Sequence, residues 1–241
     1  MMRIPSYNNN IFRINPYLRR TLRGAYLKFF GNILPVQKGI HILNAHYVQT
    51  GFTDIEKDTK IFEMYLENLK DIGSKFIRIE EATKYVTSKN PLHDKCYIAF
   101  TFDDGYEEEY VIIAPILERY NTNAAFFINS NYISSSFNYQ QSYNKRVALN
   151  TKKPMTWKHV IDLHHRGHII GGHTLDHYML NTNDNKEIFR QIVEDKKNIE
   201  DRLGKNCNYF AWPYGNSRYL SKEALDICLN YYKYIFNSDN W

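Results

Sequence analysis

The chain has few cysteines and no long apolar run, and both absences limit what it can be. Its 241 residues include three cysteines, Cys96, Cys207 and Cys228, which are too far apart for a disulfide framework or a CxxC metal site. No apolar run reaches the length of a membrane-spanning helix. The first 24 residues also lack the apolar core of a signal peptide. We therefore expect a protein of the cytoplasm or of the cytoplasmic face of a membrane.

Acidic residues are missing from the first forty positions. This segment holds seven cations and no aspartate or glutamate, whereas residues 41–241 hold 24 cations and 26 anions. The net charge of +5 therefore comes from the N-terminal segment. The remaining residues lack the excess of basic side chains that is typical of nucleic-acid-binding proteins, so nucleic acid is not an expected partner.

The basic N-terminal segment contains one predicted amphipathic helix. Asn15 and Pro16 are typical of a helix start, and apolar residues follow at helical spacing. Such a helix either binds an anionic membrane surface or packs its apolar stripe on protein. Both interpretations are open for residues 15–30. We divide the chain into a basic extension, residues 1–38, and one catalytic domain, residues 39–241.

Predicted strands and helices alternate through the second segment. The expected strands are residues 40–48, 97–102, 124–128, 168–171, 209–211 and 234–236. The expected helices are residues 59–72, 107–120, 156–166, 186–203 and 221–231. A polar connection over residues 129–153 is long enough to suggest a binding loop. Such alternation predicts βα units and a parallel sheet, either open or closed into a barrel.

Two adjacent carboxylates follow the strand that ends at residue 102. Asp103 and Asp104 precede Gly105, which permits a tight turn. Consecutive side chains on extended backbone point to opposite sides, so one carboxylate could bind a metal while the other faces a reacting water. The alternative is a turn that leads into a helix N-terminus, where aspartate is common.

Two histidines follow the next predicted strand but one. His173 and His177 are four residues apart, and they can meet one ion if the chain turns helically after Gly171 and Gly172. Four further histidines lie close by in the sequence, and we interpret them as surface or core residues: His159, His164, His165 and His168.

A third segment combines an apolar strand end with a turn. Trp212, Pro213, Tyr214 and Gly215 follow the strand that ends at Ala211. A turn of this composition can direct a backbone N–H into a cavity, as an oxyanion donor requires. An ordinary surface turn is the alternative.

Together and in this order, the three segments resemble the motifs of the polysaccharide deacetylase family, carbohydrate esterase family four, in its surface-polysaccharide branch. The motifs stand here as TFDDG at 101–105, HTLDH at 173–177 and WPYG at 212–215. The resemblance covers roughly residues 40–236. It implies an α/β fold, namely a distorted (β/α) barrel that is complete or incomplete.

The resemblance also implies a catalytic site with one divalent metal ion. Asp104, His173 and His177 would be its ligands, Asp103 the general base and the Tyr214 backbone N–H the oxyanion donor. Zn²⁺ is the expected ion, with Co²⁺ and Ni²⁺ as alternatives, because all three accept this ligand set. Such a site removes an acetyl group by hydrolysis.

Two departures from the family pattern concern proton transfer. Many members have an arginine before the third motif to orient the base, and Ala211 and Trp212 stand there instead. The family's late histidine, its general acid, has no counterpart because no histidine follows His177. The acid is therefore absent, supplied by another group, or beyond the end of the chain. His46 is a candidate pocket residue, with a structural strand-end histidine as the alternative.

The sequence as a whole predicts a metal-dependent hydrolase. It would remove an N-acetyl group from an N-acetylhexosamine in a surface glycan or its lipid-linked precursor, with Trp212, Pro213 and His46 contacting the sugar. An O-acetyl esterase, a non-sugar amidase and a glycan-binding relative that keeps the metal without catalysis are the alternatives.

Overall fold

The computed structural model describes residues 36–49, 51–88, 92, 94–147 and 152–238. Residues from Lys38 onward form one compact unit, which is described here by itself. The predicted helix that begins at Asn15, and with it the membrane contact through residues 15–30, lies outside the described residues. Among the helices that are described, none is long and apolar enough to cross a membrane.

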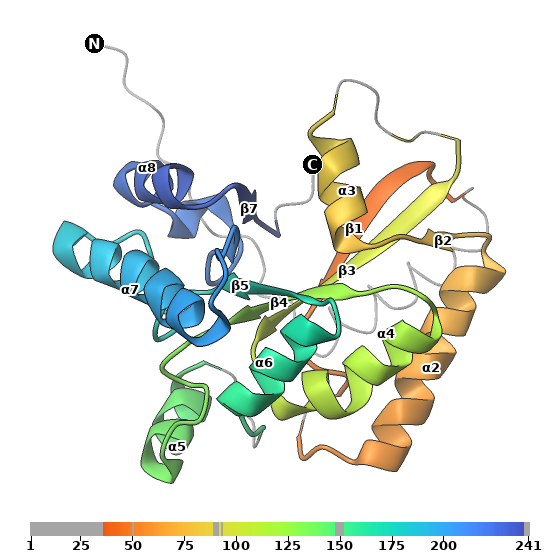
Figure 1. The fold of residues 1–241 in the computed structure, drawn as a ribbon, viewed down its shortest axis with the longest axis horizontal. Helices are drawn as coiled ribbons and strands as arrows, with labels where there is room; N and C mark the ends of the chain where they lie inside the picture. The colour runs from red at the N-terminus through yellow and green to blue at the C-terminus, as the bar shows by residue number, and fades with distance from the viewer. Residues whose placement is uncertain (1–35, 50, 89–91, 93, 148–151, 239–241) are drawn as a thin grey trace, which may run out of the picture. The chain divides into compact units, whose positions relative to one another are not determined.

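A parallel sheet forms the centre of this unit (Figure 1). Along the path of paired strands the order is β1-β3-β4-β5-β6-β7, and β2 pairs with β3 beside that path. In the described part of the chain β1 and β7 do not pair with each other. The curled sheet is therefore a half-barrel with an open seam between these two strands. The strands are β1 (Gly39–Ala45), β2 (Lys75–Phe76), β3 (Cys96–Asp104), β4 (Ala124–Ile128), β5 (Ile169–Gly172), β6 (Tyr209–Ala211) and β7 (Tyr234–Phe236).

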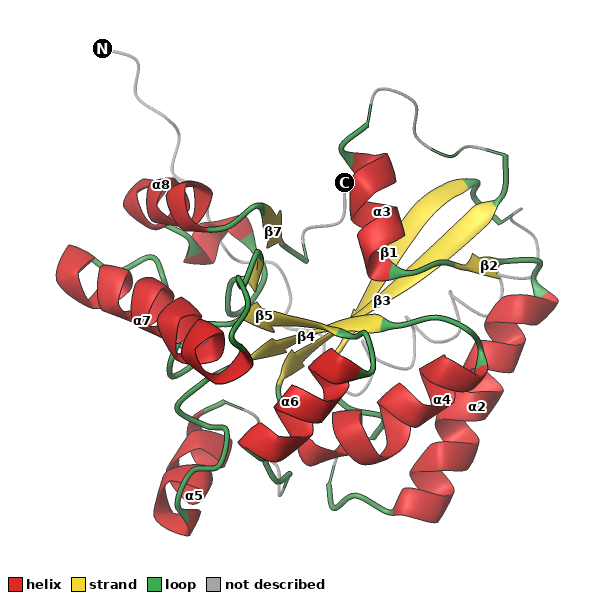
Figure 2. Ribbon diagram, in the orientation of Figure 1, coloured by secondary structure: helices red, strands yellow, loops and turns green. Residues whose placement is uncertain are grey.

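Helices cover the two faces of the sheet unequally (Figure 2). The outer face packs against apolar side chains of α2, α4, α6, α7 and α8, while the inner face packs against α3. Burial of these apolar side chains is the main driving force for the fold. The helices are α2 (Ile55–Asp71), α3 (Ile79–Val86), α4 (Ala114–Arg119), α5 (Phe137–Arg146), α6 (Trp157–His165), α7 (Asn185–Leu203) and α8 (Lys222–Tyr231).

Strand β3 carries the sequence pattern of a strand buried on both faces. All nine of its residues are buried. Tyr97 and Ala99 belong to the inner cluster, whereas Ile98, Phe100 and Phe102 belong to the outer one. This alternation places Asp103 on the inner side of the sheet, whereas Asp104 leaves the extended conformation, with φ of 82°.

Capping residues set several helix boundaries as the sequence predicts. The side chains of Thr156 and Ser221 accept hydrogen bonds from the first turns of α6 and α8. Gly204 ends α7 in the left-handed conformation, with φ of 63°. Helix α2 begins earlier than the sequence predicts, at Ile55, because Asp54 caps it.

Two other expectations about the elements are wrong. The polar connection over 129–153 is not a loop throughout, because it contains α5. Helix α3 is absent from the sequence-based assignment. The helix expected over 107–120 is present, and Glu109–Ile113 forms a π-helical turn within it, followed by α-helical Ala114–Arg119. A π-helical turn of this kind frequently occurs near functional sites.

Candidate metal centre and catalytic pocket

Three side chains from two strand ends meet in the interior. Asp104 closes β3, and His173 and His177 follow β5. Each offers one ligand atom, and these atoms all lie within 4.8 Å of one another. Asp104 Oδ1 lies 3.6 Å from Nε2 of His177 and 3.8 Å from Nε2 of His173. All three residues are buried, so the cluster is an enclosed cation site rather than a surface group of charges.

Left-handed backbone conformations, rather than a helical turn, bring the two histidines together. The expected helical turn after Gly172 is wrong, because residues 173–177 form no helix. Thr174 and His177 instead adopt left-handed backbone, with φ of 67° and 55°, and Asp104 does so with φ of 82°. Such conformations are costly for residues other than glycine and cluster at functional sites. The two imidazole rings consequently lie 5.0 Å apart.

Hydrogen bonds fix the orientation of His173. Its Nδ1 lies 2.7 Å from the carbonyl oxygen of Ala211. A carbonyl can only accept, so Nδ1 carries the proton and Nε2 keeps a free lone pair. The backbone N–H of His173 donates to Asp195 Oδ2 at 3.0 Å and to the Ile128 carbonyl.

Asp195 of α7, which accepts the His173 N–H, connects this segment to the chain after β4. It is fully buried and also accepts a hydrogen bond from the Ser130 backbone N–H at 3.0 Å. Burial raises the pKa of Asp195 to about 7. A Cβ atom at Gly172 would come within 2.8 Å of Asp195 Oδ2, which explains the glycine at this position.

The cluster fits a divalent transition metal. Within the described residues, His173 Nε2 and His177 Nδ1 are buried without a hydrogen-bond partner. Burial and the nearby charges of His173 and His46 lower the pKa of His177 well below its usual range, which favours the neutral imidazole that coordinates metals. One carboxylate and two imidazoles match the ligand chemistry of Zn²⁺, and they leave coordination positions for water and substrate.

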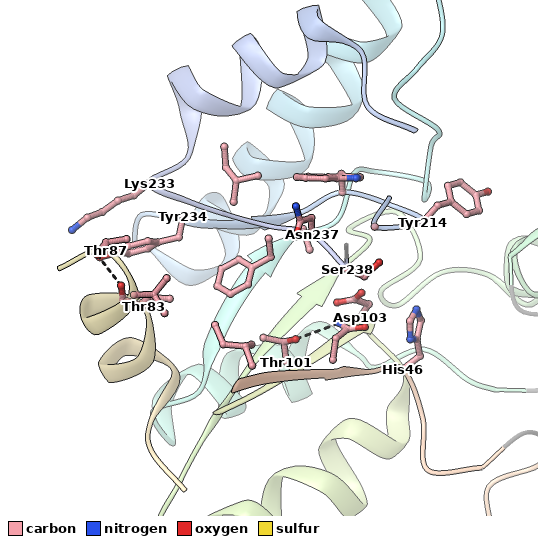
Figure 3. Close-up of a pocket in the computed structure, with 18 residues that line it drawn as sticks. His46, Thr83, Thr87, Thr101, Asp103, Tyr214, Lys233, Tyr234, Asn237 and Ser238 are labelled. Carbon is pink, nitrogen blue, oxygen red and sulfur yellow. Dashed lines mark hydrogen bonds between the residues drawn. The ribbon is translucent and has the colours of Figure 1, made fainter. Parts of the chain in front are cut away.

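Asp103 lines a cavity at the carboxyl end of β3. The cavity measures about 460 Å³ and lies along the open seam between β1 and β7. Figure 3 shows Asp103, His46 and Ser238 gathered near one end and Lys233 at the other. Asp103 Oδ1 is buried and has no hydrogen-bond partner among the described residues. Among the residues that the structure describes, no arginine lines this cavity, in agreement with the missing arginine of the third motif.

The third motif lines the same cavity in part. Tyr214 adopts left-handed backbone with φ of 67°, and its ring meets the His177 ring edge-on at 4.8 Å. Trp212 lines the cavity and donates a hydrogen bond from Nε1 to the Asn216 carbonyl at 3.2 Å. Pro213 is buried but does not line the cavity.

The four histidines assigned to surface or core lie outside the cluster. His168 is buried, where its Nδ1 accepts a hydrogen bond from the Ala124 N–H and its Nε2 lies 3.0 Å from Glu118. His159 forms a capping box with Thr156 at the start of α6. The sequence-based interpretation of these histidines is confirmed.

Helix α5 brings further polar residues to the cluster that sequence reasoning missed. Tyr143 lies with its hydroxyl oxygen 3.2 Å from Asp104 Oδ1. Tyr139, one turn earlier, contacts Asp176 between the two histidines. A serine cap at Ser136 followed by tyrosines at i, i+4 spacing was the available signal.

Comparisons with known proteins agree with the site. The family model described as polysaccharide deacetylase matches residues 90–229, which is more than half of the chain. YxkH of Bacillus subtilis is 25% identical over 174 residues, covering 72% of this chain and 56% of that protein. Peptidoglycan-N-acetylglucosamine deacetylase PgdA of Listeria monocytogenes is 25% identical over 167 residues, covering 68% and 29%.

Comparison with solved structures shows a shared fold. The structure of IcaB from Ammonifex degensii is similar with a TM-score of 0.67 at 17% identity, covering 85% of this chain and 92% of that chain. The chain thus spans nearly all of that structure, but only about half of YxkH and less than a third of PgdA. The family match and the half-barrel fold lead to one conclusion: this chain belongs to the polysaccharide deacetylase family.

Proposed function

We propose that the protein is a metal-dependent hydrolase that removes the N-acetyl group of an N-acetylhexosamine in a surface glycan or its lipid-linked precursor. One observation supports this most directly. Asp103 Oδ1 is buried with no hydrogen-bond partner among the described residues, and Asp103 lines an open cavity and directly precedes Asp104 of the Asp104, His173 and His177 cluster. This arrangement offers a base and a cation site on adjacent residues of one strand end.

Each residue has a distinct role in the proposed hydrolysis. A divalent ion held by Asp104, His173 and His177 would supply Lewis acidity toward the acetyl carbonyl and acidify water. Asp103 accepts the proton of the attacking water, because its Oδ1 has no hydrogen-bond partner in the described part of the chain. The Tyr214 backbone N–H donates to the developing oxyanion. Collapse then breaks the C–N bond and releases acetate, provided that the leaving nitrogen receives a proton.

His46 is the proposed donor of that proton. It lies just beyond β1, is exposed, and lines the cavity together with Asp103 (Figure 3). Its charge also acts on His177, which indicates proximity to the cluster. An imidazole at the open seam is thus in a position to protonate the leaving nitrogen.

His46→Gln is expected to lower kcat for deacetylation by about 10²–10⁴-fold, the usual contribution of a general acid. A proton donor must be protonated, so its loss should also remove the alkaline limb of the rate profile. Metal content should stay at the wild-type value because His46 is not a candidate ligand. A kcat within twofold of wild type would exclude His46 as the acid.

Two observations support the proposed substrate, namely the name of one relative and the size and lining of the cavity. PgdA carries the name of an N-acetylglucosamine deacetylase, so we extend an N-acetylhexosamine to this chain. The volume of about 460 Å³ is within the range of small-molecule sites, and aromatic side chains such as Trp212 and Tyr214 line it.

Acetate release provides the test. The 241-residue chain, loaded with stoichiometric Zn²⁺, should release acetate from N-acetylglucosamine oligomers and lose this activity with a chelator. O-acetylated sugars and N-acetylated amines without a sugar, tested in parallel, separate the deacetylase from an esterase or another amidase. A zinc-loaded protein that releases no acetate from any of these substrates would contradict the proposal and favour a glycan-binding relative.

A further inference from the structure

We propose that Tyr143 is a positioning residue for the metal centre, which holds the Asp104 carboxylate and couples it to the segment that carries His173. The inference rests on the metal site of the proposed function. It concerns how strongly the protein binds the ion, and not which substrate it cleaves. Tyr143 belongs to α5, an element outside the three sequence motifs.

The hydroxyl of Tyr143 lies between two acceptors. Asp104 Oδ1 is 3.2 Å away, and Asn129 Oδ1 is the second partner. The amide of Asn129 is oriented because its Nδ2 donates to the carbonyl oxygens of His173 at 2.5 Å and Thr174 at 2.9 Å. Asn129 Oδ1 must therefore face Tyr143 as an acceptor. A phenol hydroxyl, protonated at neutral pH, can donate to either oxygen.

This geometry connects the candidate ligands through three side-chain contacts. Asp104 is linked to Tyr143, Tyr143 to Asn129, and Asn129 to the backbone at His173. Both ligand segments contain left-handed, strained backbone, which persists only where the surroundings hold it. Hydrogen bonds to ligating carboxylates tune metal affinity, and removing such a partner typically weakens binding about 10–100-fold.

Packing holds the Tyr143 ring in one position. The ring stacks on Tyr132 at 3.8 Å between centroids and 12° between planes, and it is fully buried. Tyr132 is itself fixed, since its hydroxyl oxygen lies within hydrogen-bond distance of two acceptors, Asn144 Oδ1 at 2.9 Å and the Lys152 carbonyl at 3.1 Å. Loss of the Tyr143 hydroxyl alone would leave this stack intact, so its effect on the metal can be measured separately from packing.

Helix α5 also contacts the segment that carries His177. Tyr139 donates to Asp176 Oδ1, and Arg146 Nη1 donates to the Asp176 carbonyl at 2.7 Å. Asp176 precedes His177 directly. One helix therefore contacts both ligand-bearing segments, and Tyr143 is the residue in it that reaches a candidate ligand atom.

The test compares the Zn²⁺ dissociation constants of Tyr143→Phe and the wild-type chain, measured by competition with a chromophoric chelator. We expect binding to weaken about 10–100-fold. Tyr132→Phe is the matched control, because it removes a buried hydroxyl from the same ring stack that does not contact Asp104. Its dissociation constant should stay within about twofold of wild type. Thermal melting of the metal-free proteins reports how much stability each variant loses.

The outcomes separate this inference from the proposed function. Unchanged Zn²⁺ affinity in Tyr143→Phe would overturn it, as would an equal loss in Tyr132→Phe, which would indicate general loosening of the fold. A wild-type chain that binds Zn²⁺ without releasing acetate, together with weakened binding in Tyr143→Phe, would contradict the deacetylase function and still support the positioning role.

Discussion

Asp103→Asn is expected to lower kcat for acetate release by about 10²–10⁴-fold, the contribution typical of a general base, while metal content stays at the wild-type value. The replacement preserves the shape of the side chain but removes its ability to accept a proton. Asp103 lines the cavity and is outside the cluster of candidate ligands, so binding of the ion should not change. Steady-state kinetics and metal analysis of the same preparation measure the two effects.

The neighbouring carboxylate supplies a matched control for this prediction. Asp104→Asn changes the next residue in the same way, but Asp104 belongs to the cluster and accepts a hydrogen bond from Tyr143. We expect that variant to lose both metal and activity. If Asp103→Asn keeps full activity, the base is another group. If both variants lose the metal equally, the division of roles between the two carboxylates is wrong.

The sequence predicts the parallel sheet and the position of the site for a physical reason. Strands buried on both faces, such as β3 and β4, appear as continuous apolar runs that only a covered parallel sheet explains. The carboxyl ends of parallel strands meet at one edge, so motifs that follow β3, β5 and β6 come together there. Caps at Thr156 and Ser221 are local, and they too could be predicted.

Elements that depend on distant contacts could not be predicted in this way. Helix α5 has the polar sequence FNYQQSYNKR, which offers no apolar stripe, because its inward residues are tyrosines that make hydrogen bonds. The HTLDH segment has helical ligand spacing but left-handed residues at Thr174 and His177. Asn129 and Asp195 help to hold backbone of that kind, and neither residue belongs to a motif.

The open seam also changes the interpretation of the missing acid. From sequence, the absence of a histidine after His177 allows an incomplete or inactive site. In the half-barrel, β1 and β7 flank one cavity, so a residue near the start of the domain lies beside residues near its end. Proximity in space rather than order in the chain therefore makes His46 a candidate.

His173→Ala is expected to abolish stoichiometric Zn²⁺ binding and, with it, acetate release. The substitution removes one of three candidate ligands, a larger change than loss of a partner such as Tyr143. It also leaves the Ala211 carbonyl without the Nδ1 donor, which costs about 1–3 kcal/mol in a buried site. Metal analysis after dialysis measures the first effect, and denaturant unfolding of the metal-free proteins measures the second.

His168→Ala separates the two effects, since it replaces another buried histidine that lies outside the cluster. His168 accepts from the Ala124 N–H at 3.2 Å and pairs with Glu118, so its loss should reduce the free energy of unfolding by a similar amount. Its Zn²⁺ content should nevertheless equal that of wild type. Retention of Zn²⁺ by His173→Ala would exclude it as a ligand. Loss of Zn²⁺ by both variants would instead mean that any weakening of the fold empties the site, and the assignment of ligands would then have to rest on His177 and Asp104 alone.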